Sequence, residues 1–277
     1  MGGNIANLAG NYMRLYFALS YSPFSEMAWV KETGIKRVLL SYHVIGNKKV
    51  TEGHINKHKN NYEFFLDSGA FSAFTKKVKI DIDKYADFIK KTKEFWKVYA
   101  TLDVIGDWKA TKDNTGYLEK QGLSPLPVFH YKSPIKELER LATSYPYIAL
   151  GGLVPLAKQA DTLRKWLDYC YRYLLPQIKK RQLKVHGFGV NSLWAWKRYP
   201  FYSVDSTSWN QGSKYGRVKM MKDFTWTTAD KNNIYDVQRF FRDKNWKVRT
   251  EQNIKIYLKA EKLVTELWEK RGIKWNE

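Results

Sequence analysis

The sequence predicts an α/β protein of the (β/α)8 barrel class, also called a TIM barrel. Eight short apolar segments alternate with helix-like or polar segments along the chain, without a change of composition that would mark a second domain. Three of these segments stop at an aspartate, although packing gives a buried strand no reason to end on a carboxylate. A doubly wound open sheet is the alternative fold.

The predicted strands are short and rich in β-branched and aromatic residues. They cover residues 14–19, 37–41, 64–66, 98–102, 127–129, 147–150, 184–186 and 201–204. The spacing between them is too long for hairpins, and no Asn-Gly or Asp-Gly turn joins them, so helical crossovers are expected. We therefore expect one domain over 1–277, with the barrel at about 12–230.

Local start and stop signals place the helices. Ser25 is a candidate N-cap for a helix that Gly34 can end, and Asp81 is a candidate N-cap for a helix running to about Trp96. Other helices are expected from Ser133-Pro134, from Pro155 or Ala157 to about Lys179, and around 192–197. Residues 43–61, 108–120 and 209–217 are predicted as loops or connections. Two basic helices, 231–243 and 251–271, would form a C-terminal extension over about 231–277.

The charge of the chain points to a polyanionic partner. Lys and Arg number 48 against 27 Asp and Glu, a net charge of +21. Such an excess attracts nucleic acid first and an anionic membrane surface second; a lysine-rich composition without functional meaning is the remaining interpretation. No apolar run is long enough to cross a membrane, and no signal-peptide pattern is present, so a cytoplasmic protein is expected.

Metal chemistry has little support in the sequence. Cys170 is the only cysteine, which excludes a disulfide framework and a thiolate zinc cluster. His54 and His58 lie four residues apart, but the polar residues around them are typical of a solvated loop. We expect no metal, no zinc subdomain and no organic cofactor.

The carboxyl ends of barrel strands carry the working residues of barrel enzymes. Here those ends supply aspartates, a histidine and glycines: Asp67, Asp103, Asp205, His130, Gly151, Gly152 and Gly187. Paired carboxylates suit substitution at an acetal-like carbon, where one attacks C1′ and another manages the proton of the leaving group. On a basic protein, the sugar attacked in this way would belong to a nucleic acid.

Two motifs resemble those of a known family. Asp67-Ser68-Gly69-Ala70-Phe71 is similar to the Asp-Ser-Gly-Gly-Phe/Tyr motif of tRNA-guanine transglycosylases, and Ala149-Leu150-Gly151-Gly152-Leu153 is similar to their Gly-Gly-Leu turn. The short chain without a zinc cluster most resembles the DpdA-type DNA 7-deazaguanine transglycosylases of phages and bacteria. The resemblance implies exchange of guanine in DNA for a free 7-deazaguanine base, without a cofactor.

The resemblance also implies roles for single residues. Asp205 would be the nucleophile that forms a covalent glycosyl link, and Asp67 the general acid/base. Asp103 would recognise the base. The implied substrate-binding set around it is Ser68, Gly69, Phe71, His130, Gly151, Gly152, Leu153 and Gly187.

Basic segments 43–61 and 209–222 and the C-terminal helices are expected to grip phosphates. The candidate nucleic-acid contacts are Lys57, Lys59, Trp209, Lys214, Tyr215 and Arg217, and Trp209, Tyr215 or Trp226 would stack on an extruded nucleotide. Three alternatives stay open: the same exchange on tRNA, a non-catalytic nucleic-acid-binding barrel, and a hydrolase of free nucleosides or sugars. The sequence context, the need for a partner protein and the oligomeric state, which could be a monomer, also stay open.

Overall fold

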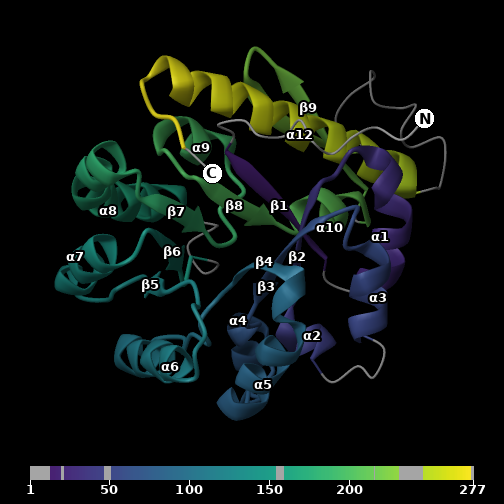
Figure 1. Cartoon of the computed structure of the whole chain (residues 1–277). Coiled ribbons are helices and arrows are strands. Elements are labelled where there is room, and N and C mark those ends of the chain that lie inside the picture. The colour runs from purple at the N-terminus through teal and green to yellow at the C-terminus, as the bar shows by residue number, and fades with distance from the viewer. Residues whose placement is uncertain are drawn as a thin grey trace.

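The computed structural model describes residues 13–19, 22–46, 51–153, 159–214, 216–230 and 246–275. Its centre is one sheet of eight parallel strands, with helices around the outside (Figure 1). The strands are β1 (Arg14–Leu19), β2 (Arg37–Ser41), β3 (Glu63–Asp67), β4 (Trp96–Tyr99), β5 (Val128–His130), β6 (Tyr147–Gly151), β7 (Lys184–Gly187) and β8 (Ser203–Ser206). All eight predicted strands are therefore present, within a few residues of the predicted bounds.

The order of the strands is that of a curled sheet. It runs β4-β3-β2-β1-β8-β7-β6-β5, so the first strand pairs with the last and β4 and β5 form the two edges. Between these edges, the residues that the structure describes form one isolated parallel bridge, Ala100 to Leu126, in place of a ladder. There the amide of Thr101 donates to the Leu126 carbonyl at 2.9 Å. We call this junction of β4 and β5 the seam.

The helices are α1 (Pro23–Val30), α2 (Tyr42–Ile45), α3 (Thr51–His58), α4 (Ala70–Thr75), α5 (Ile82–Thr92), α6 (Trp108–Lys120), α7 (Ile135–Ser144), α8 (Ala160–Arg181), α9 (Leu193–Arg198), α10 (Ser208–Lys214) and α12 (Trp246–Lys270), with 3-10 turns η2 (Lys31–Thr33) and η3 (Lys93–Phe95). Asp81 caps α5 as predicted, accepting from the amides of Asp83 and Lys84. Gly34 ends η2 with a left-handed φ of 88°. Among the described residues, no helix has the length and apolarity needed to span a membrane.

Three segments predicted as loops or connections are helical. The 43–61 region contains α2 and α3, 108–120 is α6, and most of 209–217 is α10. The amphipathic pattern of α3 is weak, because Ile55 and His58 are the only residues of 52–58 that it buries. Asp107 caps α6 through the amide of Ala110 at 3.0 Å. The cap is a sequence signal for this helix.

A two-stranded hairpin follows the eighth strand. Its strands, β9 (Arg217–Lys222) and β10 (Thr225–Asp230), are antiparallel. The turn residues Asp223 and Phe224 have positive φ angles of 49° and 53°, as a two-residue turn with the twist of its strands requires. This hairpin lies outside the eight predicted strands, whose ladders are all parallel, and its turn lacks the glycine that usually announces a hairpin.

The C-terminal helix α12 packs across the starts of β1 and β2 (Figure 1). Its Glu261 carboxylate accepts from the Leu15 amide at 2.7 Å and from the Arg37 guanidinium at 2.9 Å. The other helix expected in the extension, at 231–243, lies outside the described residues.

Alternate residues of the strands fill two separate cores. Outward-facing side chains such as Phe17 and Phe64 pack beneath the helices in the main core. Inward-facing side chains fill the inside of the curled sheet with a second cluster: Tyr16, Ala18, Leu39, Phe65, Ala100, Leu126, Val128 and Ala149. The inside of the sheet is therefore packed, as in barrels, and is not a channel.

Charged and aromatic groups close the amino-terminal end of the strands. The Arg14 guanidinium donates to both oxygens of the Glu63 carboxylate, each at 3.1 Å, and lies over the ring of Tyr202. Tyr16 donates to the same carboxylate from inside the sheet. With this end filled, the carboxyl-terminal end is the place for a functional site.

Candidate functional site

Asp67 is the last residue of β3 and begins the predicted motif. Its Oδ2 accepts from the Gly69 amide at 3.0 Å. Gly69 has a φ of +79°, and a Cβ there would lie 2.4 Å from both Ser41 Oγ and His43 Cβ. Only glycine satisfies both conditions, so this tight turn into α4 explains the third residue of the motif.

Asp67 shares an electrostatic environment with the other two aspartates. Burial raises its pKa to about 8, with further increases from the charges of Asp103 and Asp205, against the opposing effect of the Gly69 and Ser68 amides. Its carboxyl group is therefore largely protonated at neutral pH. Asp103 and Asp205 therefore lie close enough to Asp67 for their charges to act on its carboxyl group.

Asp103, which follows β4, is held from two sides. Ser68 Oγ donates to its Oδ1 at 2.8 Å, and His130 Nε2 lies 2.9 Å from its Oδ2. His130 is the last residue of β5 and is only 4% exposed. Its other ring nitrogen, Nδ1, is buried without a hydrogen-bond partner among the described residues. The two strands at the seam thus place Asp103 and His130 in direct contact.

The Gly151-Gly152 pair lies beside this contact. A Cβ on Gly151 would come within 2.6 Å of Val128 Cγ1 and 3.0 Å of His130 Cδ2. Gly152 has a φ of +70°, which disfavours any other residue. Leu153, next in the predicted turn, is buried. The first glycine therefore makes room for the His130 ring, and the second turns the chain.

Asp205 projects from β8 and is 8% exposed. The Gly189 amide donates to its Oδ1 at 2.8 Å, and His186 Nε2 lies 3.3 Å from the same oxygen. On the other side of the imidazole, Nδ1 is 2.6 Å from Ser203 Oγ, which is 2.5 Å from the Tyr147 hydroxyl. Burial lowers the pKa of His186 and Asp205 opposes that shift, so a polar chain with a neutral imidazole supports Asp205 from inside the sheet.

Two residues of this site were not among the predicted site residues. His186 touches Asp205, and Phe188 packs on the rings of His186 and Phe65, with centroid separations of 4.4 Å and 5.8 Å. The sequence signal for His186 is its position near the end of β7. Its side chain points to the inside of the curled sheet, as does that of Phe188 two residues later. Nothing local marked Phe188, because its role depends on the curl of the sheet.

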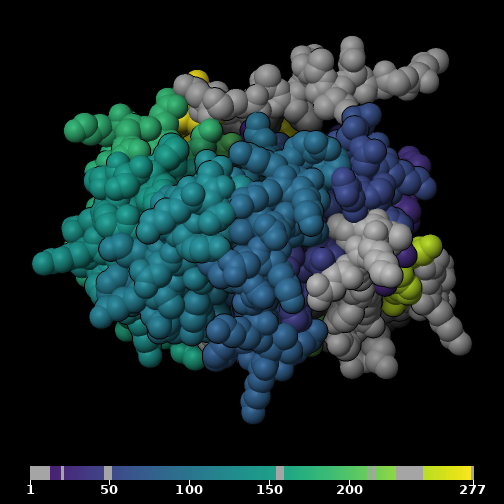
Figure 2. All heavy atoms as spheres, turned by 60° about the horizontal axis from the view of Figure 1, so that its bottom comes forward, coloured from purple at the N-terminus to yellow at the C-terminus, as the bar shows by residue number. Residues whose placement is uncertain are grey.

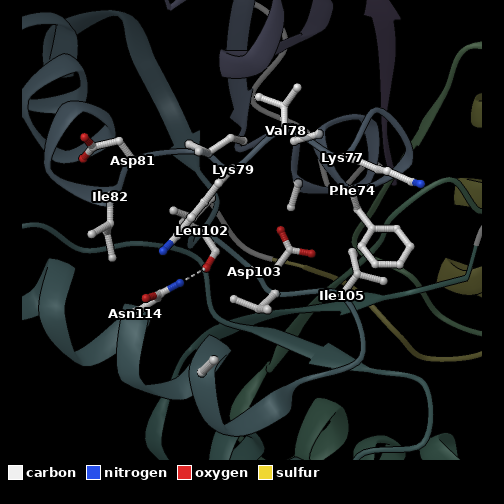
Figure 3. Close-up of a pocket in the computed structure, with 15 residues that line it drawn as sticks. Phe74, Lys77, Val78, Lys79, Asp81, Ile82, Leu102, Asp103, Ile105 and Asn114 are labelled. Carbon is white, nitrogen blue, oxygen red and sulfur yellow. Dashed lines mark hydrogen bonds between the residues drawn. The ribbon is translucent and has the colours of Figure 1, made fainter.

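A cavity of about 1030 Å³ opens next to Asp103 (Figure 3). One wall is α4 with the segment that leads to α5, and the other is the loop after β4 with the start of α6. Figure 3 shows Asp103 between these walls, with Phe74 above Ile105 and Asn114 at the opposite end. Sequence reasoning did not find this cavity, since its walls come from segments without a motif.

Two predicted base-binding residues have other positions. Gly187 has a packing reason to be glycine: its Cβ would lie 2.8 Å from Phe201 Cε1 and 2.9 Å from Val190 Cγ2, in the main core. Phe71 is half-buried in the first turn of α4. Neither residue touches the Asp103–His130 pair through a contact that we observe.

The predicted nucleic-acid contacts differ in accessibility. Trp209 is fully buried against Phe17, and its indole N–H donates to the Ala18 carbonyl at 3.2 Å. The prediction that it stacks on a nucleotide is therefore wrong. Trp226 packs on Tyr257, with ring centroids 4.9 Å apart. Exposed cations remain at Lys57, Lys59 and Arg217, while Tyr215 and the Lys214 side chain lie outside the described residues.

Within the part of the chain that the structure describes, no group of three or more His, Cys, Asp or Glu side chains is placed to hold a metal ion. His54 stacks on Phe24, with ring centroids 4.5 Å apart, and His58 is buried.

No known family model matches this sequence, and no curated protein matches it.

Proposed function

We propose that the protein is a guanine transglycosylase, which exchanges guanine in DNA for a 7-deazaguanine base through a covalent aspartyl-glycosyl intermediate. The observation that carries this proposal is the buried Asp67 carboxyl group, whose pKa is raised to about 8 by burial and then by the charges of the nearby Asp103 and Asp205. A protonated carboxyl group beside ionisable ones supplies an acid and a nucleophile in one site. The two sequence motifs support the same chemistry.

We also propose that the sheet is a closed (β/α)8 barrel. The strand order, the Ala100–Leu126 bridge and the packed interior favour closure over an open sheet. In such a barrel, all three aspartates lie on the carboxyl-terminal rim, where barrel enzymes carry their active sites.

In the first half of the reaction, an Asp205 oxygen attacks C1′ of the target nucleoside. The C1′–O bond forms as the C1′–N9 bond to guanine breaks, and Asp67 gives its proton to the departing base. The Gly189 amide donates to Oδ1 of Asp205, and His186 Nε2 lies 3.3 Å from the same oxygen. Together they would orient the carboxylate for attack.

The second half reverses these steps with a different base. Asp67, now ionised, takes the N9 proton of the incoming 7-deazaguanine. N9 then forms a bond to C1′ as the bond between C1′ and Asp205 breaks. Protons and charges return to their starting positions, so the exchange needs no cofactor.

Asp103 would bind the N–H edge of the base in both halves. Ser68 and His130 fix its carboxylate, so that it meets the base in one orientation. The polypeptide turn at Gly151-Gly152 brings main-chain groups next to the same contact. Exposed cations such as Lys57, Lys59 and Arg217 would hold the DNA phosphates.

Labelled guanine tests the proposal. The protein is incubated with labelled guanine and either DNA or tRNA, and a covalent adduct is sought on a denaturing gel. Asp205→Ala should abolish both exchange and adduct, while Asp113→Ala, which changes an exposed carboxylate of α6, should retain both. Circular dichroism verifies that each variant folds.

Each outcome has a distinct meaning. Exchange that persists in Asp205→Ala contradicts the role of the nucleophile. Label that enters tRNA and not DNA moves the substrate to tRNA. Wild-type protein that binds nucleic acid without exchange or adduct supports the non-catalytic alternative.

A further inference from the structure

The cavity beside Asp103 is larger than one base contact requires. Its volume of about 1030 Å³ lies at the upper end of the range of about 300–1,000 Å³ that is typical of small-molecule sites. The proposed mechanism uses only Asp103 from its lining. The residues of α4, of the segment after α4 and of the loop after β4 have no role in that mechanism. In the space-filling view, these segments lie within the blue to teal surface (Figure 2).

An exposed aromatic ring borders the cavity. Phe74 is 60% exposed and Val78 is 51% exposed. Among the large apolar side chains of the described residues, these two and Tyr169 stand out as exposed, and two of the three line this cavity. Figure 3 shows the Phe74 ring over Ile105. Exposed apolar groups gathered around a cavity mark a binding surface, and an aromatic face is a platform on which a nucleobase stacks.

Two lysines accompany this apolar surface. In Figure 3, Lys79 reaches across the cavity in the direction of Asn114, and Lys77 points outward past Phe74. The neighbouring carboxylate of Asp81 is engaged as the N-cap of α5. The cavity therefore offers an apolar wall together with ammonium groups that can meet a phosphate.

Lys77 occupies a backbone position that favours glycine. Its φ is 54°, and the turn around it joins the Val78 amide to the Ala73 carbonyl at 2.9 Å and the Lys77 amide to the Phe74 carbonyl at 3.1 Å. This is the Schellman ending of a helix, where glycine is the usual left-handed residue. The left-handed backbone does not call for a lysine here, and its side chain puts a cation at the rim of the cavity.

We infer that this cavity binds the nucleotide next to the reacting one in a single-stranded or locally unstacked polynucleotide. Its base would stack on Phe74, and its phosphate would meet Lys77 and Lys79. Asp103 lines this cavity and also contacts Ser68 and His130, so the two subsites are continuous. The inference rests on the proposed function and adds a second nucleotide subsite to it.

Oligonucleotide binding tests the subsite without requiring any chemistry. Single-stranded DNA with one guanine is prepared intact, or with an abasic residue on the 5′ or 3′ side of that guanine. Fluorescence anisotropy then gives Kd for each. One of the two neighbouring bases, on the 5′ or the 3′ side, is expected to stack on Phe74. Its removal should weaken wild-type binding about 5- to 150-fold, the range that corresponds to one stacked base.

Phe74→Ala should weaken binding of the intact strand to the same degree. With this variant, the abasic residue on that side should cause no further change in Kd. Tyr169→Ala, which removes an exposed aromatic side chain from α8, is the matched control and should behave as wild type. Lys77→Gln should reduce the slope of log Kd against log salt by about 0.7, as the loss of one phosphate contact predicts. Lys165→Gln, an exposed lysine of α8, should leave the slope unchanged.

Equal wild-type affinity for all three strands overturns the subsite, as does a Phe74→Ala variant that stays sensitive to the abasic residue. Labelled-guanine exchange is measured on the same strands. Exchange without the Phe74 effect contradicts the subsite alone, while the Phe74 effect without exchange contradicts the proposed reaction and leaves the nucleotide site standing.

Discussion

Ser68 and Asp103 join two neighbouring strand ends through one hydrogen bond. Ser68 Oγ donates to Asp103 Oδ1 at 2.8 Å and accepts from the Ala70 amide at 3.2 Å. Ser68 is fully buried, so this geometry is sheltered from water. The residue that follows Asp67 in the motif thus orients the Asp103 carboxylate, which lies after the next strand, β4.

Ser68→Ala should release Asp103 and lower the free energy of unfolding by about 1 kcal/mol, the net value of one hydrogen bond. The KM for the incoming base should rise more than kcat falls, because Asp103 is proposed to bind the base and not to react. Urea denaturation and exchange kinetics measure the two effects. Ser144→Ala, at an exposed position of α7, is the control, and a change in kcat alone would count against this role of Ser68.

Asp67 should make the protein less stable as pH rises. Its pKa is about 8 in the folded protein, against an ordinary value of 3.8 for an aspartate, so between these values the folded state holds a proton that the unfolded state has lost. The contribution of this proton to the free energy of unfolding is fully present below about pH 4. It falls by at most about 1.4 kcal/mol per pH unit up to about pH 8. Asp67→Asn should flatten this dependence in urea denaturation at constant ionic strength, and an unchanged slope would show that Asp67 ionises normally.

Gly151→Ala should disturb the Asp103–His130 contact. The added Cβ would lie 2.6 Å from Val128 Cγ1 and 3.0 Å from the His130 ring, which must move. Overpacking of this kind lowers the free energy of unfolding by about 1–3 kcal/mol, and base exchange should fall with it. Gly116→Ala is the matched control, because a Cβ on that α6 glycine meets nothing within 4 Å and should stabilise the helix by about 0.5–1 kcal/mol. A stable and active Gly151→Ala variant would refute the steric argument.

His186→Phe should slow formation of the covalent adduct. The substitution removes the imidazole beside Asp205 and leaves Ser203 without its nitrogen partner, at an expected loss of about 1–3 kcal/mol in unfolding free energy. Tyr147→Phe removes only the far hydroxyl of the chain and should reduce stability without slowing the adduct. Rapid quenching of the reaction across pH separates the two effects. Equal rates in both variants would mean that His186 does not position Asp205.

The strands were predictable because their signal is local. An apolar run such as Phe64–Leu66 ends on Asp67, and the same pattern marked Asp103 and Asp205, whose charges both act on Asp67. Helix α3 gave a weaker signal, since its polar sequence buries little. The hairpin was missed because Asp223 and Phe224 take positive φ angles without a glycine.

Other features depend on contacts that one sequence does not reveal. Trp209 looks like a stacking residue in a polar loop, yet α10 turns it into the main core against Phe17. His186 becomes part of the site only because β7 and β8 pair in the register that sets it beside Asp205. The cavity next to Asp103 requires α4 and the loop after β4 to face each other, and neither segment carries a motif.

The Asp103–His130 contact also lies at the seam, where the two edges of the sheet meet. Asp103 follows edge strand β4 and His130 ends edge strand β5, and these strands are joined by the backbone bridge between Ala100 and Leu126. The side-chain contact therefore adds a second link between the two edges of the sheet. A ligand that draws Asp103 away from His130 removes that link, so binding at the site is coupled to the contact between the two edges of the sheet.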